Sequence, residues 1–121
     1  MAKIYEVILL YLNKDHQFTK EEVDRELKSN MLIVEAIQRN SWFGELISIG
    51  DVKADPFLCN FSNIAFKIIQ YYWIDNILGG SIEILDTPKG KILEACISKV
   101  QFKMNGVFNT EQFLITHFNA Y

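Results

Sequence analysis

Two cysteines and two histidines are the residues of this chain whose side chains could support nucleophilic or metal-binding chemistry: His16, Cys59, Cys96 and His117. A thiol beside an imidazole can form a nucleophile and its base, and the same donor atoms bind zinc. Neither cysteine lies in a Cys-x-x-Cys spacing, and no local signature surrounds either one. We therefore expect no catalytic residue and no metal site, with both thiols reduced and buried. A small enzyme built on a Cys–His pair is an alternative that the sequence leaves open.

The two histidines have ordinary structural interpretations. His16 follows Asp15 in a polar stretch, where a solvated imidazole is expected. His117 lies beside apolar residues and is expected at the edge of the core. The segment TPKGK lacks the further glycines and the Lys-Ser/Thr ending of a phosphate-binding loop. The sequence therefore predicts a protein without a cofactor and without an enzymatic activity.

The irregular stretch 40–60 places aromatic residues among acids. Trp42 and Phe43 lie next to Glu45, and Asp51 and Asp55 follow. An aromatic side chain supplies desolvated contact area at an interface, while nearby charges steer an oppositely charged partner. The pattern predicts a surface for a basic protein centred on Trp42. The other interpretation is a core aromatic beneath a solvated loop.

Composition indicates one soluble acidic domain spanning 1–121. Half of the 121 residues are hydrophobic, which is enough for a core without metals or disulfides. Twelve Lys and Arg against fifteen Asp and Glu give a net charge of -3, which disfavours nucleic-acid binding and suits a basic partner. The apolar run 7–12 lacks the features of a signal peptide, and no stretch reaches the roughly 20 apolar residues of a membrane helix. We expect a cytoplasmic protein.

Helical spacing of apolar residues predicts a mainly helical α+β fold of about five helices with one small hairpin. The expected helices cover Ile4 to Leu12, Lys20 to about Arg39, Ser62 to Tyr72, Pro88 to about Met104, and a short segment from Asn109 or Thr110 to Phe118.

Local signals mark two of these helix starts. Thr19 and Glu22 form a capping box, and Thr87-Pro88 combines an N-cap with a first-turn proline. A break at Ser29-Asn30 is the alternative to one long second helix.

The stretch GGSIEILDTPKGKIL, which begins at Gly79, predicts the hairpin, near 74–85. A Gly-Gly pair favours a tight two-residue turn between strands 74–78 and 81–85. In the competing interpretation, the preceding helix runs on to Leu78 and Gly79 ends it as a C-cap.

The segment IIQYYWIDNILGGSIEILDTPKGKIL, residues 68–93, resembles the part of winged helix-turn-helix domains that contains the recognition helix, the wing and the next helix. The family has a leucine directly before its threonine, where this chain has Asp86. The resemblance implies a helix placed for the DNA major groove, on which only Asn63, Lys67 and Gln70 would be available to read bases. The acids of the wing oppose that use.

These observations favour a non-enzymatic protein-binding module. One specific form is an immunity or antitoxin-like inhibitor that covers the basic active site of a nuclease toxin. Its partner-binding residues would be Trp42, Glu45, Asp51 and Asp55, with Glu21 and Asp24 as the next acidic surface. The alternative is a winged-helix transcription regulator.

Overall fold

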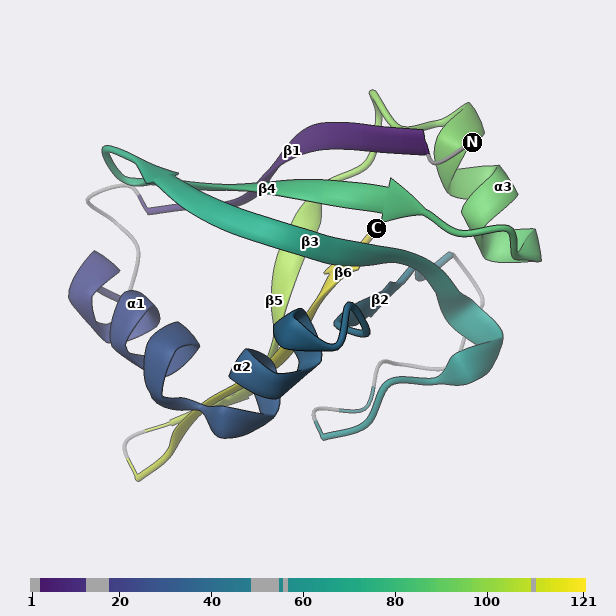
Figure 1. Ribbon diagram of the computed structural model, residues 1–121. Coiled ribbons are helices and arrows are strands. Elements are labelled where there is room, and N and C mark those ends of the chain that lie inside the picture. Colours follow the sequence, from purple (N-terminus) through teal and green to yellow (C-terminus); the bar gives the residue numbers. More distant parts are fainter. Residues whose placement is uncertain (1–2, 13–17, 49–54, 56, 110) are drawn as a thin grey trace.

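The computed structural model describes residues 3–12, 18–48, 55, 57–109 and 111–121 (Figure 1). Within these residues the strands are β1 (Lys3–Tyr11), β2 (Phe43–Glu45), β3 (Ile64–Ile74), β4 (Ile77–Ile84), β5 (Phe102–Phe108) and β6 (Phe113–Ala120). The helices are α1 (Lys20–Ser29), α2 (Met31–Gln38) and α3 (Pro88–Ala95), with a 3-10 turn at Phe61–Asn63. None of these helices is long and apolar enough to span a membrane.

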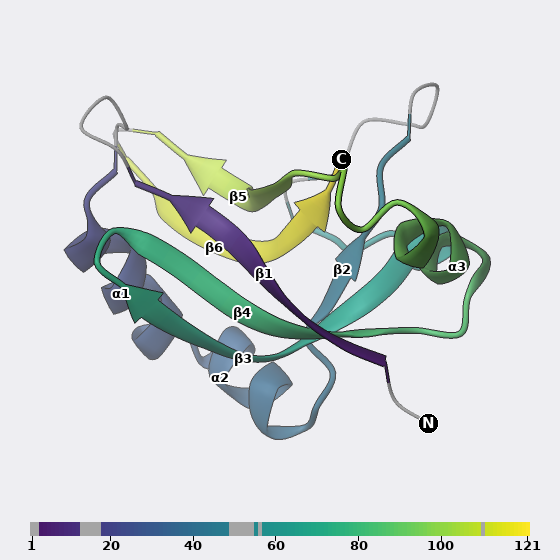
Figure 2. The same ribbon diagram turned by 90° about the horizontal axis from the view of Figure 1, so that it is seen from above.

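The strands form two antiparallel sheets, which are joined by backbone pairing at the end of β2. The larger sheet has the order β1-β4-β3-β2, and β5 pairs with β6 in a separate hairpin. A parallel bridge between Leu46 and Ala120 links the end of β2 to β6, and the amide of Ile47 donates to the Ala120 carbonyl over 2.9 Å. The strands thus follow the order β1-β4-β3-β2-β6-β5. The ends of this series, β1 and β5, lie beside each other without strand pairing (Figure 2).

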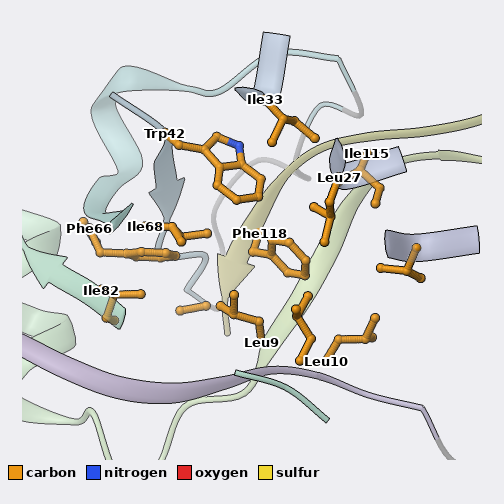
Figure 3. Packing of buried hydrophobic residues seen from close by; sticks show 14 of the residues in the cluster. Leu9, Leu10, Leu27, Ile33, Trp42, Phe66, Ile68, Ile82, Ile115 and Phe118 are labelled. Carbon is orange, nitrogen blue, oxygen red and sulfur yellow. The ribbon is translucent and has the colours of Figure 1, made fainter. Parts of the chain in front are cut away.

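The core lies between the larger sheet and the elements beneath it. Helices α1 and α2 and the β5–β6 hairpin lie on the same side of that sheet (Figure 1). Fully buried side chains from both sides meet there, and they include Leu9, Phe66, Ile68 and Phe118 (Figure 3). Trp42 is 4% exposed and packs edge to face on Phe118, with the ring centroids 5.9 Å apart.

The prediction of a mainly helical fold with five helices is wrong. The segments expected as the first, third and last helices are the strands β1, β3 and β6. β3 reads IAFKIIQYYWI, and its first five residues are buried apart from Lys67. A strand buried on both faces gives a nearly continuous apolar run, which helical spacing also fits. Its β-branched and aromatic residues favour the extended form.

The predicted hairpin exists, but its turn lies elsewhere. The chain reverses at Asp75-Asn76, and Asp75 adopts a positive φ of 52°. Gly79 and Gly80 lie inside β4, so they form neither the turn nor a helix C-cap. Their small size is used for packing, because a Cβ on Gly79 would lie 2.5 Å from the Tyr72 ring and one on Gly80 would lie 2.6 Å from Leu9.

The winged helix-turn-helix resemblance is also wrong. Residues 68–93 contain most of β3, all of β4 and the start of α3, so no recognition helix precedes the hairpin. The three suggested base-reading residues lie in or just before β3. Lys67 there pairs with Glu83 over 3.4 Å, and Gln70 donates to Ser81 over 3.2 Å.

Both capped helix starts are present. Thr19 and Glu22 form the capping box of α1, and Thr87 accepts from the Gly90 amide at the start of α3. The second helix breaks at Asn30, as in the alternative interpretation. Asn30 caps both pieces: its amide N–H ends α1, and its side-chain oxygen accepts from Leu32.

Candidate functional site

A groove with a volume of about 970 Å³ lies between β1 and β5. β1 lines one wall along residues 5–11, and β5 lines the other through Phe102, Met104 and Phe108. Ile97 and Val100, from the connection after α3, complete it. Most of the lining side chains are apolar, and Glu6 and Lys103 are the charged residues among them.

Each wall of the groove is an edge strand. Among the described residues, β1 pairs only with β4, and β5 pairs only with β6. An edge strand has backbone N–H and C=O groups that are not used in its own sheet, and these can pair with another extended chain. The groove therefore combines backbone hydrogen-bonding groups with apolar side chains.

A second arrangement joins Glu45, Cys59 and His117. Glu45 ends β2, Cys59 precedes the 3-10 turn, and His117 lies on β6. His117 Nε2 and Glu45 Oε2 are 3.0 Å apart, and the side chains are 3% and 1% exposed respectively. One donor atom from each of the three residues lies within 4.8 Å of the others.

Asparagine side chains position the elements around this cluster. Asn119 Oδ1 accepts from the Glu45 amide over 3.2 Å, and Asn119 Nδ2 donates to Asn105 over 3.3 Å. Asn105 in turn donates to the backbone carbonyl of Asp55 over 2.8 Å. The Asp55 carboxylate accepts from the amides of Phe57 and Leu58, the two residues that precede Cys59. Two buried atoms, Glu45 Oε1 and His117 Nδ1, have no hydrogen-bond partner within the part of the chain that the structure describes.

The electrostatics of this cluster oppose nucleophilic catalysis. Burial, and secondarily the Glu45 carboxylate, raise the pKa of the Cys59 thiol to about 12. Burial is also the largest influence on His117 and lowers its pKa, while the contact with Glu45 acts in the opposite direction. A reactive cysteine needs a lowered pKa, because the thiolate is the nucleophile. The proximity of Cys59 and His117 alone therefore does not make a nucleophile–base pair.

The predicted interface residues do not form one exposed surface. Trp42 and Glu45 are buried. Asp55 is exposed, and Asp51 lies outside the described residues. Trp42 fills the core because its ring packs on Phe118 and its indole N–H donates to the Thr116 carbonyl over 3.1 Å.

The two acids of α1 lie apart from that stretch and differ from each other. Glu21 is exposed in the first turn. Asp24 is partly buried and pairs with Lys28 over 2.8 Å.

A Cys–His pair was only an alternative in the sequence, and the fold brings Cys59 and His117 together. His117 and Asn119 are two residues apart on β6, so their side chains lie on the same face once 113–120 is known to be a strand. Cys96 takes no part, since it caps α3 and its thiol donates to the Ile92 carbonyl. Both thiols are free, as expected, but both cysteines are partly exposed and not buried. His16 lies outside the described residues.

The comparisons with known proteins give a likeness of fold. No family model matches the chain, and no curated protein matches it in sequence. Its structure is similar to that of the bacteriophage T4 capsid assembly protease gp21, with a TM-score of 0.57 and 17% sequence identity. The match covers 98% of this chain and 73% of the phage protein.

Proposed function

We propose that this protein is a binding module that takes up an extended, apolar segment of another polypeptide in the groove between β1 and β5. The observation that supports this function is the pair of free strand edges facing a groove of about 970 Å³. That volume is at the upper end of the roughly 300–1,000 Å³ typical of ligand cavities. Addition of a strand to a sheet edge uses the backbone of the ligand for affinity and its alternate side chains for specificity.

The lining favours an apolar occupant. Val7, Val100 and Met104 are partly exposed and present hydrocarbon surface, and the two charged lining residues have opposite signs. The amine of Lys103 also lies 5.1 Å from the ring centroid of Tyr121, which gives that charge a partner within the chain. A strongly charged ligand would therefore find little complementary charge in this groove.

The likeness to a phage protease is compatible with peptide binding. A protease must hold a polypeptide, and the shared fold extends over nearly all of this chain. The proposal carries over the binding of an extended chain and not the cleavage. The raised pKa of Cys59 argues against cleavage by a thiolate.

The more specific hypothesis of a toxin inhibitor has less support. Its aromatic anchor Trp42 and its acid Glu45 are buried, so they are not accessible to a partner. Among the described residues, Glu21 on α1 and Asp55 are the acids of that hypothesis that are exposed. A basic partner on α1 would use a different face from the groove.

Fluorescent peptides that alternate threonine with an apolar residue provide a direct test. We expect saturable binding of Thr-Val-Thr-Val-Thr-Val-Thr, or of its Leu or Phe counterpart, by fluorescence anisotropy. There are two control peptides. One carries N-methyl groups on its apolar residues, and the other carries them on its threonines. Each removes the N–H donors along one edge of the peptide. Methylation on the pairing edge should weaken binding at least tenfold, because about three hydrogen bonds worth about 1 kcal/mol each are lost.

Two matched variants assign the binding to the groove. Ile8 lines the groove and is 58% exposed, whereas Ile92 on α3 is 51% exposed and does not line it. Ile8→Asp should weaken peptide binding strongly, and Ile92→Asp should leave it unchanged. Equal binding of the parent and both methylated peptides would overturn the proposal. Binding of a fatty acid in place of every peptide would assign the groove to a lipid.

A further inference from the structure

A buried acid without a basic partner lies between β2 and β6. Glu45 is 1% exposed, and among the described residues its carboxylate contacts the imidazole of His117 and forms no ion pair with a lysine or arginine. One of its carboxylate oxygens and one ring nitrogen of His117 find no hydrogen-bond partner among the residues that the structure describes. Such atoms are rare in folded proteins, so their presence calls for an explanation.

We infer that Glu45, Cys59 and His117 form a binding site for a transition-metal cation of the zinc class. Their donor atoms converge within 4.8 Å, and they come from three separate parts of the chain. None of the three residues lines the groove between β1 and β5, so this site is independent of the proposed peptide binding.

The geometry of the pair agrees with shared coordination. His117 Nε2 and Glu45 Oε2 are 3.0 Å apart. Two ligands bound at 2.0–2.1 Å around one tetrahedral zinc lie about 3.3 Å apart, so little movement of these side chains is needed. Cys59 lies outside the regular elements and is partly exposed, so its thiol can approach the ion and its side offers a path of entry.

The donor atoms of the three residues favour a transition metal of the zinc class. Sulfur and imidazole nitrogen suit zinc and its neighbours, whereas magnesium and calcium prefer oxygen alone. On binding, the Cys59 thiol loses its proton to the buffer as the metal–sulfur bond forms. The thiolate and the carboxylate then balance the two positive charges of the ion. Three protein ligands leave a fourth tetrahedral position for water or another donor.

Cobalt and zinc ions added to untagged, chelator-treated protein test this site. Co²⁺ should give a thiolate-to-cobalt charge-transfer band, which zinc then abolishes. The band should persist in Cys96→Ser, the matched control, and disappear in Cys59→Ser and Glu45→Gln. At a free Zn²⁺ concentration 100-fold above its Kd, Tm should rise by about 10 °C in the wild type, because the ion binds the folded state.

A second measurement uses the unaltered chain in case the variants do not fold. Zinc should protect Cys59 from alkylation, as read by mass spectrometry, while Cys96 continues to react. If the extent of Cys59 alkylation is the same with and without zinc, as it is expected to be for Cys96, the inference is overturned. A cobalt band that survives in Cys59→Ser, or the absence of any cobalt band in the wild type, would also overturn it. Glu45 and His117 would then be a hydrogen-bonded pair only.

Discussion

The indole N–H of Trp73 donates a hydrogen bond of 3.0 Å to the carboxylate of Asp24, which joins the end of β3 to helix α1. The second carboxylate oxygen of Asp24 pairs with Lys28 over 2.8 Å. The amine of Lys20 lies 5.3 Å from the centre of the Trp73 ring. Asp24 therefore connects helix α1 to the larger sheet, and its carboxylate stabilises the fold.

Replacement of Asp24 should destabilise the protein. Asp24→Ala removes the acceptor of a partly buried indole N–H, and hydrogen bonds to charged groups contribute about 1.5–3 kcal/mol. We expect a loss of about 1–2 kcal/mol in urea unfolding, because a quarter of the Asp24 side chain is exposed. Glu21→Ala on the same helix is the control and should change stability by less than about 0.5 kcal/mol. Equal losses in the two variants would contradict this role.

The contribution of Asp24 should depend on pH. The hydrogen bond from Lys28 is the largest cause that lowers the pKa of Asp24 below its ordinary value of 3.8. A lowered folded-state pKa contributes stability that is present above the unfolded value and is lost as the pH falls through the folded value. The stability difference between the wild type and Asp24→Asn should thus stay constant above about pH 5 and shrink below pH 4. Urea unfolding at a series of pH values measures this stability difference. A difference that does not change with pH would show that the charge of Asp24 does not contribute.

Trp42 should behave as a core residue and not as an interface residue. Trp42→Ala removes a buried ring and should cost about 3–5 kcal/mol. Trp42→Phe retains an aromatic ring against Phe118 but loses the donor to Thr116, and it should cost clearly less. Thermal unfolding of both variants makes the comparison. A stable Trp42→Ala protein would contradict the packing in Figure 3.

Two glycines should differ sharply in their tolerance of a methyl group. A Cβ on Gly44 would lie 2.1 Å from Phe66 and 2.5 Å from the backbone oxygen of Phe118, both of which are fully buried. Gly44→Ala should cost about 3 kcal/mol or more, as overpacking of a core does. A Cβ on Gly79 would meet only the Tyr72 ring, which is partly exposed and can turn away, so Gly79→Ala should cost less. Chemical denaturation of the pair tests the order.

Local signals identified the capped helices, and the strands needed information from beyond their own residues. The capping box at Thr19 and the Thr87-Pro88 start depend on contacts within four residues, so they are visible in the sequence. β3 is a strand because β2 and β4 pair with it on both sides. Apolar spacing alone does not reveal those partners.

The candidate sites also depend on contacts between residues that are far apart in the sequence. Glu45 and His117 are 72 residues apart, and only the contact of β2 with β6 brings them together. The groove depends on the absence of pairing between β1 and β5 among the described strands, and no motif encodes that feature. Trp42 was predicted to be the centre of a binding surface, but its side chain is buried in the core.

The junction of β2 with β6 constrains when this chain can fold during its synthesis. The amide of Glu45 bonds to the side chain of Asn119, which lies 74 residues later. A ribosome must therefore release the chain as far as β6 before β2 can acquire its second neighbour. Until then β2 and the emerging larger sheet have an open side, and closing so long a segment carries an entropic cost that slows folding. The strand that joins the two sheets, β6, thus lies far downstream of β2 in the chain.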